Sequence, residues 1–273
     1  MRVDLHIHTT ASDGSWNPAS LVAEVKSAEI GLFAVTDHDT VGGIVETALL
    51  AKAAGLKFIP GVEISTTLGG QSFHILGYGI QPDSQELIKL LQYNTGLMEE
   101  TDHNSIKQLI ARGYRIDYEE YRSYQSEAGR GGWKSLNFLI DKGFCRNVNE
   151  FFTSLFTAQN GIQFPEFPPP SAATAAIRAA GGLAILAHPG SSFHGPELEE
   201  TLDFFAKEAI DGIECYHPGH DETTIKRAVA WCRRRNLMIT GGSDCHGTFV
   251  PKRKLGQPVI WQEDLELGRL AAF

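Results

Sequence analysis

The chain has 273 residues, of which 42% are hydrophobic and 21% charged, and its formal net charge is −9 at pH 7. This length suits one large α/β domain, or one with a sizeable insertion. No apolar run reaches the roughly 18 residues that a membrane span needs, and the acidic balance argues against strong binding of long nucleic acids, which requires an excess of Lys and Arg.

Short apolar segments alternate with amphipathic helical segments along most of the chain. The predicted strands are, in chain order, Val3–Ile7, Leu32–Thr36, Phe58–Val62, Ser72–Tyr78, Leu183–Ala187, Gly212–Cys215 and Leu237–Gly241. The predicted helices include Pro18–Glu29, Val41–Ala54, Pro196–Glu208 and Asp221–Arg235. This alternation is typical of a mostly parallel α/β fold.

The alternation stops between about Pro82 and Pro170. This stretch is rich in Glu, Tyr, Arg and Phe, lacks clear alternating strands and favours helices. The run Phe167-Pro168-Pro169-Pro170 then marks a stiff return to the first pattern. We therefore predict one domain formed by residues 1–81 and 171–273, with a mostly helical insertion subdomain at residues 82–170.

Metal-binding side chains follow the predicted strands at the point where each strand ends. The segment Asp4–His8 is the clearest case, because His6 and His8 alternate along a strand and so share one face. The next turn can bring Asp13 toward them. Similar segments are Ala34–Asp39, Ile59–Glu63, His74–Tyr78, Ile185–Pro189, Glu214–His217 and Gly241–His246. Since the carboxyl ends of parallel strands share one rim, we expect these side chains to converge there.

Each of these residues also has an ordinary structural interpretation. A lone histidine at a strand end is commonly hydrogen-bonded, and a lone Asp after a strand commonly caps a helix. Recurrence favours the metal site, because seven of the 10 histidines lie in these segments. Imidazole and carboxylate ligands suit zinc, manganese or iron. The absence of cysteine clusters argues against a closed structural zinc site.

The cysteines and the N-terminal residues favour a cytoplasmic location. Cys145, Cys215, Cys232 and Cys245 form no CxxC pair and fit reduced, mostly buried thiols of a cytoplasmic protein. Only Cys245 could lie near the chemistry. The chain enters its first strand directly after Met1-Arg2, so we expect no signal peptide. The basic run Arg233–Arg235 fits a solvated helix end.

Taken in order, these motifs resemble the PHP (polymerase and histidinol phosphatase) superfamily of metal-dependent phosphoesterases. The segments that carry the resemblance are Asp4–Gly14, Thr36–Asp39, Gly61–Ser65, His74–Tyr78, Ala187–Gly190 and Gly241–Gly247. The resemblance implies a distorted (βα)7-type, TIM-like barrel with two or three divalent metal ions (Mn, Zn or Fe) at the strand ends. It is strongest to a stand-alone branch with a helical insertion, some members of which resemble nucleotide or short-RNA phosphatases.

The resemblance also implies which residues hold the ions. The first ion would be held by His6, His8, Glu63 and Asp244. Glu63 would bridge to a second ion, completed by His74 and His188. Asp13, His38 and His246 would hold the third.

The insertion departs from the branch that it resembles. A segment that usually reads Gly-Arg-Pro-His is here Gly129–Lys134, with the sequence Gly-Arg-Gly-Gly-Trp-Lys. Phosphoester chemistry follows from the resemblance, whereas nucleotide specificity does not. Arg130 and Lys134 are candidate phosphate clamps, or else two surface cations at a helix start. Trp133 either stacks on a substrate ring or belongs to the core of the insertion.

We expect a hydrolase acting on a small anionic phosphate ester. The substrate would be a phosphomonoester of a nucleotide or other small metabolite, or a short RNA end, attacked in line by a metal-bridging hydroxide. Glu63 would be catalytic as the bridging ligand. His217 would bind the phosphate or protonate the leaving oxygen, unless it is only a hydrogen-bonded strand-end residue. Asp37 and Asp39 would orient neighbouring imidazoles.

Two other functions stay open. An amidohydrolase-like enzyme, which cuts a C–N bond, also places His-x-His at the end of its first barrel strand. It would usually need a bridging carbamylated Lys, whereas here Glu63 occupies the bridging place. The other is a non-catalytic metal-binding or regulatory module; degenerate PHP domains of this kind typically lose ligands, and this chain retains all those that the resemblance implies.

Overall fold

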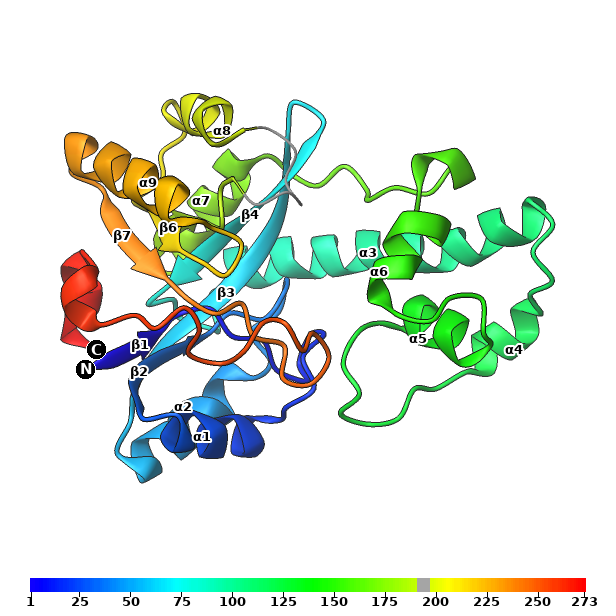
Figure 1. The fold of residues 1–273 in the computed structure, drawn as a ribbon, viewed down its shortest axis with the longest axis horizontal. Coiled ribbons are helices and arrows are strands. Elements are labelled where there is room, and N and C mark those ends of the chain that lie inside the picture. The colour runs from blue at the N-terminus through cyan, green and yellow to red at the C-terminus, as the bar shows by residue number, and fades with distance from the viewer. Residues whose placement is uncertain (191–196) are drawn as a thin grey trace.

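The computed structural model describes residues 1–190 and 197–273. Within them, a seven-stranded sheet runs in the order β1 to β7 and curls on itself, with helices on its outside (Figure 1). The strands are β1 (Arg2–Asp4), β2 (Ile30–Val35), β3 (Lys57–Leu68), β4 (Gln71–Tyr78), β5 (Leu183–Leu186), β6 (Gly212–Tyr216) and β7 (Met238–Gly241). The predicted α/β fold is confirmed.

The sheet is parallel except around β4, which runs antiparallel to both neighbours. β3 and β4 form a hairpin whose two-residue turn is Gly69-Gly70, with φ angles of 60° and 78° that glycine adopts at no steric cost. So short a turn requires an antiparallel pair. Glu63 therefore lies within a long strand instead of at its end, contrary to the sequence prediction.

The first and last strands close the sheet. The Leu5 N–H donates to the Gly241 carbonyl over 3.2 Å, and Ile7 forms a parallel bridge with Cys245. Asp4 strengthens this closure, because its buried carboxylate accepts hydrogen bonds from the N–H groups of Ser243 (2.9 Å) and Gly256 (2.8 Å). The residues after β1 thus lie beside the residues after β7, although more than two hundred positions separate them in sequence.

Helices cover the outside of the sheet. They are α1 (Pro18–Ser27), α2 (Ile44–Ala54), α7 (Pro170–Ala179), α8 (Leu198–Phe205) and α9 (Glu222–Arg235). α1 begins where Asn17 accepts from the Ser20 N–H, with Pro18 in the first turn, as sequence rules expect. α8 lies within the predicted helix Pro196–Glu208 but ends at Phe205, and Pro196 itself lies outside the described residues. α7 was not among the predicted helices, because the proline run before it reads as extended chain.

The stretch between β4 and α7 is helical, as predicted, and lies to one side of the barrel (Figure 1). It contains α3 (Gln85–Ala111), α4 (Tyr118–Ser123), α5 (Lys134–Asp141) and α6 (Val148–Glu150), then a π-helical turn at Phe151–Leu155 and a 3-10 turn at Ala158–Asn160. The long α3 belongs to two cores: Leu87 and Leu91 pack in the barrel, whereas Ile106 and Leu109 pack in the insertion. The predicted domain division at residues 82 and 170 stays a prediction.

The chain ends beside its beginning (Figure 1). Short 3-10 turns at Gln262–Asp264 and Gly268–Ala272 follow β7, and Trp261 bridges Arg2 of β1. Among the described residues, no helix combines the length and the apolar composition that crossing a bilayer would require.

Candidate metal centre

The side chains predicted to bind metal lie together where β1, β2, β5 and β7 end and the β3–β4 hairpin passes. Three sets of ligand atoms each fit within 4.8 Å of one another: His6, His8, Glu63 and Asp244; His8, Asp13, His38 and His246; and His38, Glu63 and His74. A fourth set joins His6, His188 and Glu214. All nine predicted ligands therefore meet in one cluster, and Glu214 is an addition to them.

Glu63 lies at the centre of the cluster, and its side chain is only 1% exposed. Its Oε2 lies 3.1–3.2 Å from ring nitrogens of His6, His8 and His38. Its Oε1 lies 2.8 and 2.9 Å from ring nitrogens of His74 and His188. One carboxylate thus faces two separate groups of imidazoles, which is the arrangement that a ligand shared by two ions requires.

The cluster needs positive charge. His6 places Nδ1 2.9 Å from Glu214 Oε1, and because a carboxylate only accepts, the Nδ1 atom carries the proton. In the neutral ring, Nε2 then offers a lone pair to Glu63 Oε2, which also offers lone pairs. Burial lowers the pKa of His6, but the charges of Glu214 and Glu63 raise it well above its usual range. A proton or a metal ion must therefore lie between these groups.

The surroundings of His8 show that a metal ion fits this cluster. Its two ring nitrogens are buried and have no hydrogen-bond partner among the residues that the structure describes. Nevertheless Nε2 lies 3.2 Å from Glu63 Oε2 and 3.1 Å from Asp244 Oδ1. Leaving a buried nitrogen unpaired costs about 1–3 kcal/mol, and a coordinated cation removes that cost. The nitrogen and oxygen donors thus fit a divalent ion such as zinc, manganese or iron.

Asp37 and Asp39 hold backbone and hydroxyl groups instead of imidazoles. Asp37 accepts from the Thr9 N–H at 2.7 Å, the Thr9 hydroxyl at 2.7 Å and the Ser12 hydroxyl at 2.6 Å. Asp39 accepts from the Ser65 N–H and the Asn94 side-chain amide, and burial raises its pKa to about 6. Among the hydrogen bonds of the described residues, neither carboxylate bonds to an imidazole; both fix the segments that carry the ligands, so they orient the imidazoles only indirectly.

His217 lies at the edge of the cluster. The Gly219 N–H donates to its Nδ1 at 3.0 Å, so in the neutral ring the proton is on Nε2. That Nε2 lies 3.3 Å from Asp244 Oδ2, and the His217 ring centroid lies 5.1 Å from that of His188. The structure therefore gives His217 an N–H group directed at a predicted ligand.

Two residues of the site were missed by reasoning from strand ends. Glu214 belongs to a noted segment but had no role; the signal for it is a carboxylate between Ile213 and Cys215 in an otherwise apolar strand. Arg253 forms an ion pair with Asp244, with 2.5 Å between its NH1 and Oδ2. The signal for Arg253 is a second basic run, Lys252-Arg253-Lys254, in the loop after β7.

Other groups engage the two cations predicted to clamp phosphate. Arg130 NH1 lies 2.6 Å from Asp141 Oδ1, and Lys134 donates to the Arg122 carbonyl at 2.7 Å. Their loop nevertheless reaches the site, because the Gly132 N–H donates to the Asp13 carbonyl at 2.7 Å. Substrate contact by Arg130 and Lys134 stays a prediction.

Trp133 packs among aromatic rings of the insertion. Its ring centroid lies 5.6 Å from that of Phe151 and 6.4 Å from that of Phe249. Phe249 comes from the loop after β7, three residues beyond His246 in sequence. The core interpretation of Trp133 therefore agrees with this packing, and the same packing joins the insertion to the loop beside the metal ligands.

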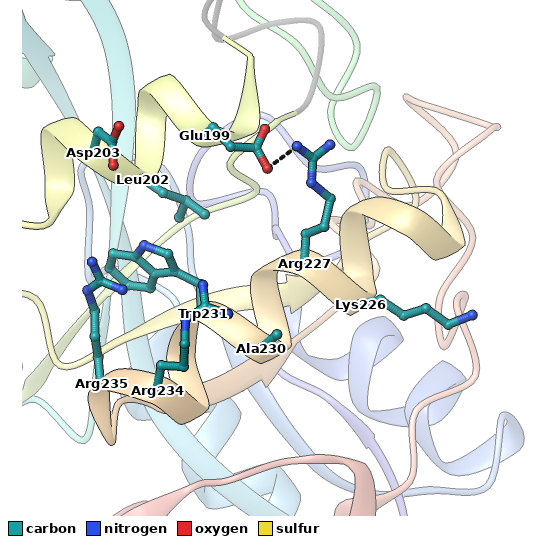
Figure 2. A pocket seen from close by; sticks show the side chains of 9 residues that line it. All are labelled: Glu199, Leu202, Asp203, Lys226, Arg227, Ala230, Trp231, Arg234 and Arg235. Carbon is teal, nitrogen blue, oxygen red and sulfur yellow. Dashed lines mark ion pairs between the residues drawn. The ribbon is translucent and has the colours of Figure 1, made fainter.

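A separate surface pocket of about 570 Å³ lies between α8 and α9 (Figure 2). Of the residues that the structure describes, none of the predicted site residues lines it. Three of the cations that line it have partners: Lys226 pairs with Glu222, Arg227 pairs with Glu199, and Arg235 Cζ lies 4.1 Å from the Trp231 ring centroid. Arg233 pairs with Glu266. The run Arg233–Arg235 thus fits the predicted solvated helix end, and the pocket lies apart from the candidate site.

Comparisons with known proteins bear on this cluster. The family model of the PHP domain matches residues 4–145. The chain is 30% identical over 280 residues to the 5'-3' exoribonuclease Rnm of Escherichia coli (strain K12), covering 97% of this chain and 88% of that one. It is 29% identical over 274 residues to the 3',5'-nucleoside bisphosphate phosphatase of Chromobacterium violaceum, covering 96% and 95%. A solved structure from Bifidobacterium adolescentis, provisionally described as a metal-dependent phosphoesterase, superposes with a TM-score of 0.83 at 25% identity, covering 96% and 93%.

Proposed function

We propose, from the premise that this chain belongs to the PHP domain family of metal-dependent phosphoesterases, that its substrate is a nucleotide phosphomonoester or the end of a short RNA. The observation that supports metal-dependent chemistry is the position of Glu63 between two groups of imidazoles, and the substrate class rests on the relatives. Two relatives of nearly the same length, each at about 30% identity, are named for a nucleoside bisphosphate and for RNA. Their shared chemistry, a nucleotide phosphate, is what we carry over.

The proposed cofactors are two or three divalent ions, of manganese, zinc or iron. The residues that would hold them are His6, His8, Glu63 and Asp244 for one ion, and Asp13, His38 and His246 for another. A further ion would be held by Glu63, His74 and His188, because ring nitrogens of these two imidazoles lie 2.8 and 2.9 Å from Glu63 Oε1. When bound, such ions lower the pKa of a coordinated water and neutralise phosphoryl oxygens. Nitrogen and oxygen donors without cysteine support all three metals, and the supply in the cell selects among them.

The protein's own groups complete the proposed reaction. The Nε2–H of His217 is directed at the ligand set, so it can donate to a phosphoryl oxygen or protonate the leaving oxygen. Glu214 fixes the ring of His6. Arg130 and Lys134 remain candidate contacts for the part of the substrate beyond the reacting phosphate. Contact by Arg130 requires that it leave Asp141.

The setting of this reaction is also part of the proposal. All four cysteines are free thiols, and all are buried. Cysteines without disulfides are usual where thiols are kept reduced. This usage supports the cytoplasmic location that we propose.

A substrate panel tests the proposed function. Manganese-loaded protein is assayed with p-nitrophenyl phosphate, a nucleoside 3',5'-bisphosphate, a 5'-phosphorylated short RNA and an amide, with chelated protein as the control. We expect inorganic phosphate or mononucleotide from the phosphate esters and no product from the amide. Hydrolysis of the amide alone would establish the amidohydrolase alternative. A metal-loaded protein that hydrolyses no member of the panel would favour a non-catalytic module.

A further inference from the structure

We propose that Arg253 is a substrate-binding residue, whose guanidinium holds an oxygen of the reacting phosphoryl group beside the metal centre. The inference rests on the proposed function and adds a contact that the family model, which matches residues 4–145, does not reach. It starts from one ion pair. Arg253 NH1 lies 2.5 Å from Asp244 Oδ2, whereas Asp244 Oδ1 lies 3.1 Å from His8 Nε2.

Asp244 thus has two differently engaged oxygens. Oδ1 faces the imidazoles of the predicted first metal site, at 3.5 Å from His6 Nε2 and 3.1 Å from His8 Nε2. Oδ2 receives two donors, Arg253 NH1 and His217 Nε2. Two N–H groups therefore converge on one anionic oxygen at the edge of the ligand set. A phosphoryl oxygen placed beside the ligands meets the same two donors.

The position of Arg253 fits a group that meets the substrate. Its side chain is 34% exposed, whereas that of Asp244 is 3% exposed. Arg253 therefore reaches from the buried ligands to solvent. Two hydrogen bonds anchor the loop that carries Arg253. The backbone N–H of Arg253 donates to the Val250 carbonyl at 2.9 Å, and the Gly256 N–H donates to the Asp4 carboxylate.

The chemistry of the pair favours exchange over a permanent structural contact. Among the described residues, Asp244 is the one ion-pair partner of Arg253, and the planar guanidinium has five N–H donors. A divalent ion on Asp244 withdraws charge from the carboxylate and so weakens its attraction for Arg253. A phosphate dianion offers more charge and several oxygens in a geometry that suits bidentate binding by arginine. Arg253 is therefore suited to leave Asp244 and bind the phosphate of the substrate instead.

The test compares Arg253→Met and Arg253→Lys with Lys252→Met, which removes an exposed cation from the same loop. Calorimetry measures the binding of inorganic phosphate to each manganese-loaded protein, and the bound manganese is counted in the same samples. We expect phosphate affinity to fall about tenfold in Arg253→Met, the size of one charge-assisted hydrogen bond. Arg253→Lys should recover part of it, and Lys252→Met should match the wild type, with bound manganese equal in all four proteins.

Two results overturn the inference. One is an unchanged phosphate affinity in Arg253→Met. The other is a loss of manganese that accounts for the loss of phosphate, because Arg253 would then only position Asp244. A different result would contradict the proposed function alone. If the wild type hydrolysed no phosphate ester while its phosphate binding still depended on Arg253, the proposed contact would stand and the proposed activity would be wrong.

Discussion

His6 and Glu214 form a fully buried contact in which Nδ1 of the imidazole lies 2.9 Å from Oε1 of the carboxylate. The other oxygen of Glu214, Oε2, accepts from the His188 N–H at 2.9 Å. One carboxylate on β6 therefore fixes the ring of a ligand that follows β1 and the backbone of a ligand that follows β5. His188 has a positive φ of 30°, a strained conformation that this hydrogen bond supports.

Removing the charge of Glu214 should weaken metal binding without unfolding the protein. In Glu214→Gln the side chain keeps its size, but the amide is a weaker acceptor for the His6 Nδ1–H. We expect a loss of about 10–100-fold in metal affinity, the usual effect of losing a group that orients a ligand. Competition with a chelating dye measures it. Glu266→Gln, which removes an exposed carboxylate paired with Arg233, is the control. Equal affinities in the two variants would contradict the role given to Glu214.

The metal-free protein should lose stability as pH rises. Burial lowers the pKa of His8, but Asp244 and Glu63 raise it overall from 6.5 to about 10. The folded state therefore binds a proton more tightly than the unfolded chain. This stabilisation is complete below pH 6.5 and is lost as the pH rises through about 10.

Thermal unfolding of chelated protein between about pH 7 and 10 measures this loss. We expect the midpoint temperature to fall across that range in the wild type and to fall less in His8→Gln. Bound metal replaces the proton, so the loaded wild type should also show the smaller slope. Identical slopes in chelated wild type and His8→Gln would show that His8 does not carry the effect.

Gly131 should be needed where the insertion meets the ligand loop. Its φ is 78°, and a Cβ there would lie 2.6 Å from the Phe249 Cβ and 2.7 Å from the Asp13 carbonyl oxygen. Relief requires movement of the backbone that carries Asp13. Gly143 has a similar φ of 74° with no atom within 4 Å of its Cβ position, so it is the matched control.

We expect Gly143→Ala to lower the free energy of unfolding by about 1–2 kcal/mol, the cost of the left-handed conformation alone. Gly131→Ala should lower it further and should also weaken metal binding, through Asp13. Denaturant titration and metal counting on both variants measure the two effects. Equal free energies of unfolding in the two variants would show that the contact with Asp13 is not tight.

Arg130 offers a paired test of substrate contact. Since Asp141 now holds its guanidinium at 2.6 Å, Asp141→Asn should free Arg130 and lower the KM for a nucleotide substrate. Arg130→Met should raise that KM by about tenfold, as expected for loss of a charge-assisted hydrogen bond. A KM that is unchanged in Arg130→Met would leave Arg130 as a surface cation paired with Asp141.

The convergence of these side chains could be predicted from sequence because most of them lie in or next to an apolar strand segment, whereas their grouping around ions came from the resemblance to the PHP superfamily. His6 and His8 follow β1, His188 follows β5, and Asp244 follows β7, so the strand pattern placed them at one rim. The extension of β3 past Glu63 could not be predicted in this way. It depends on pairing with β4, which is not a local property of the segment.

Glu214 and Arg253 could not be assigned from the sequence for the same physical reason. Glu214 contacts His6, and Arg253 contacts Asp244, and sequence spacing encodes neither contact. Closure of the sheet brings the first contact about, and the anchored loop after β7 brings about the second. Pairs of this kind become visible only when the side chains are placed in space.

The most direct test of the account measures bound metal and phosphate release on the same samples of wild type and Glu63→Gln. Glu63 faces both groups of imidazoles, so its loss removes a ligand from two predicted ions at once. We predict that manganese-loaded wild type binds two or three ions per chain and releases phosphate from a nucleotide ester, whereas folded Glu63→Gln loses metal and nearly all turnover. Wild-type metal content and turnover in Glu63→Gln would contradict the account.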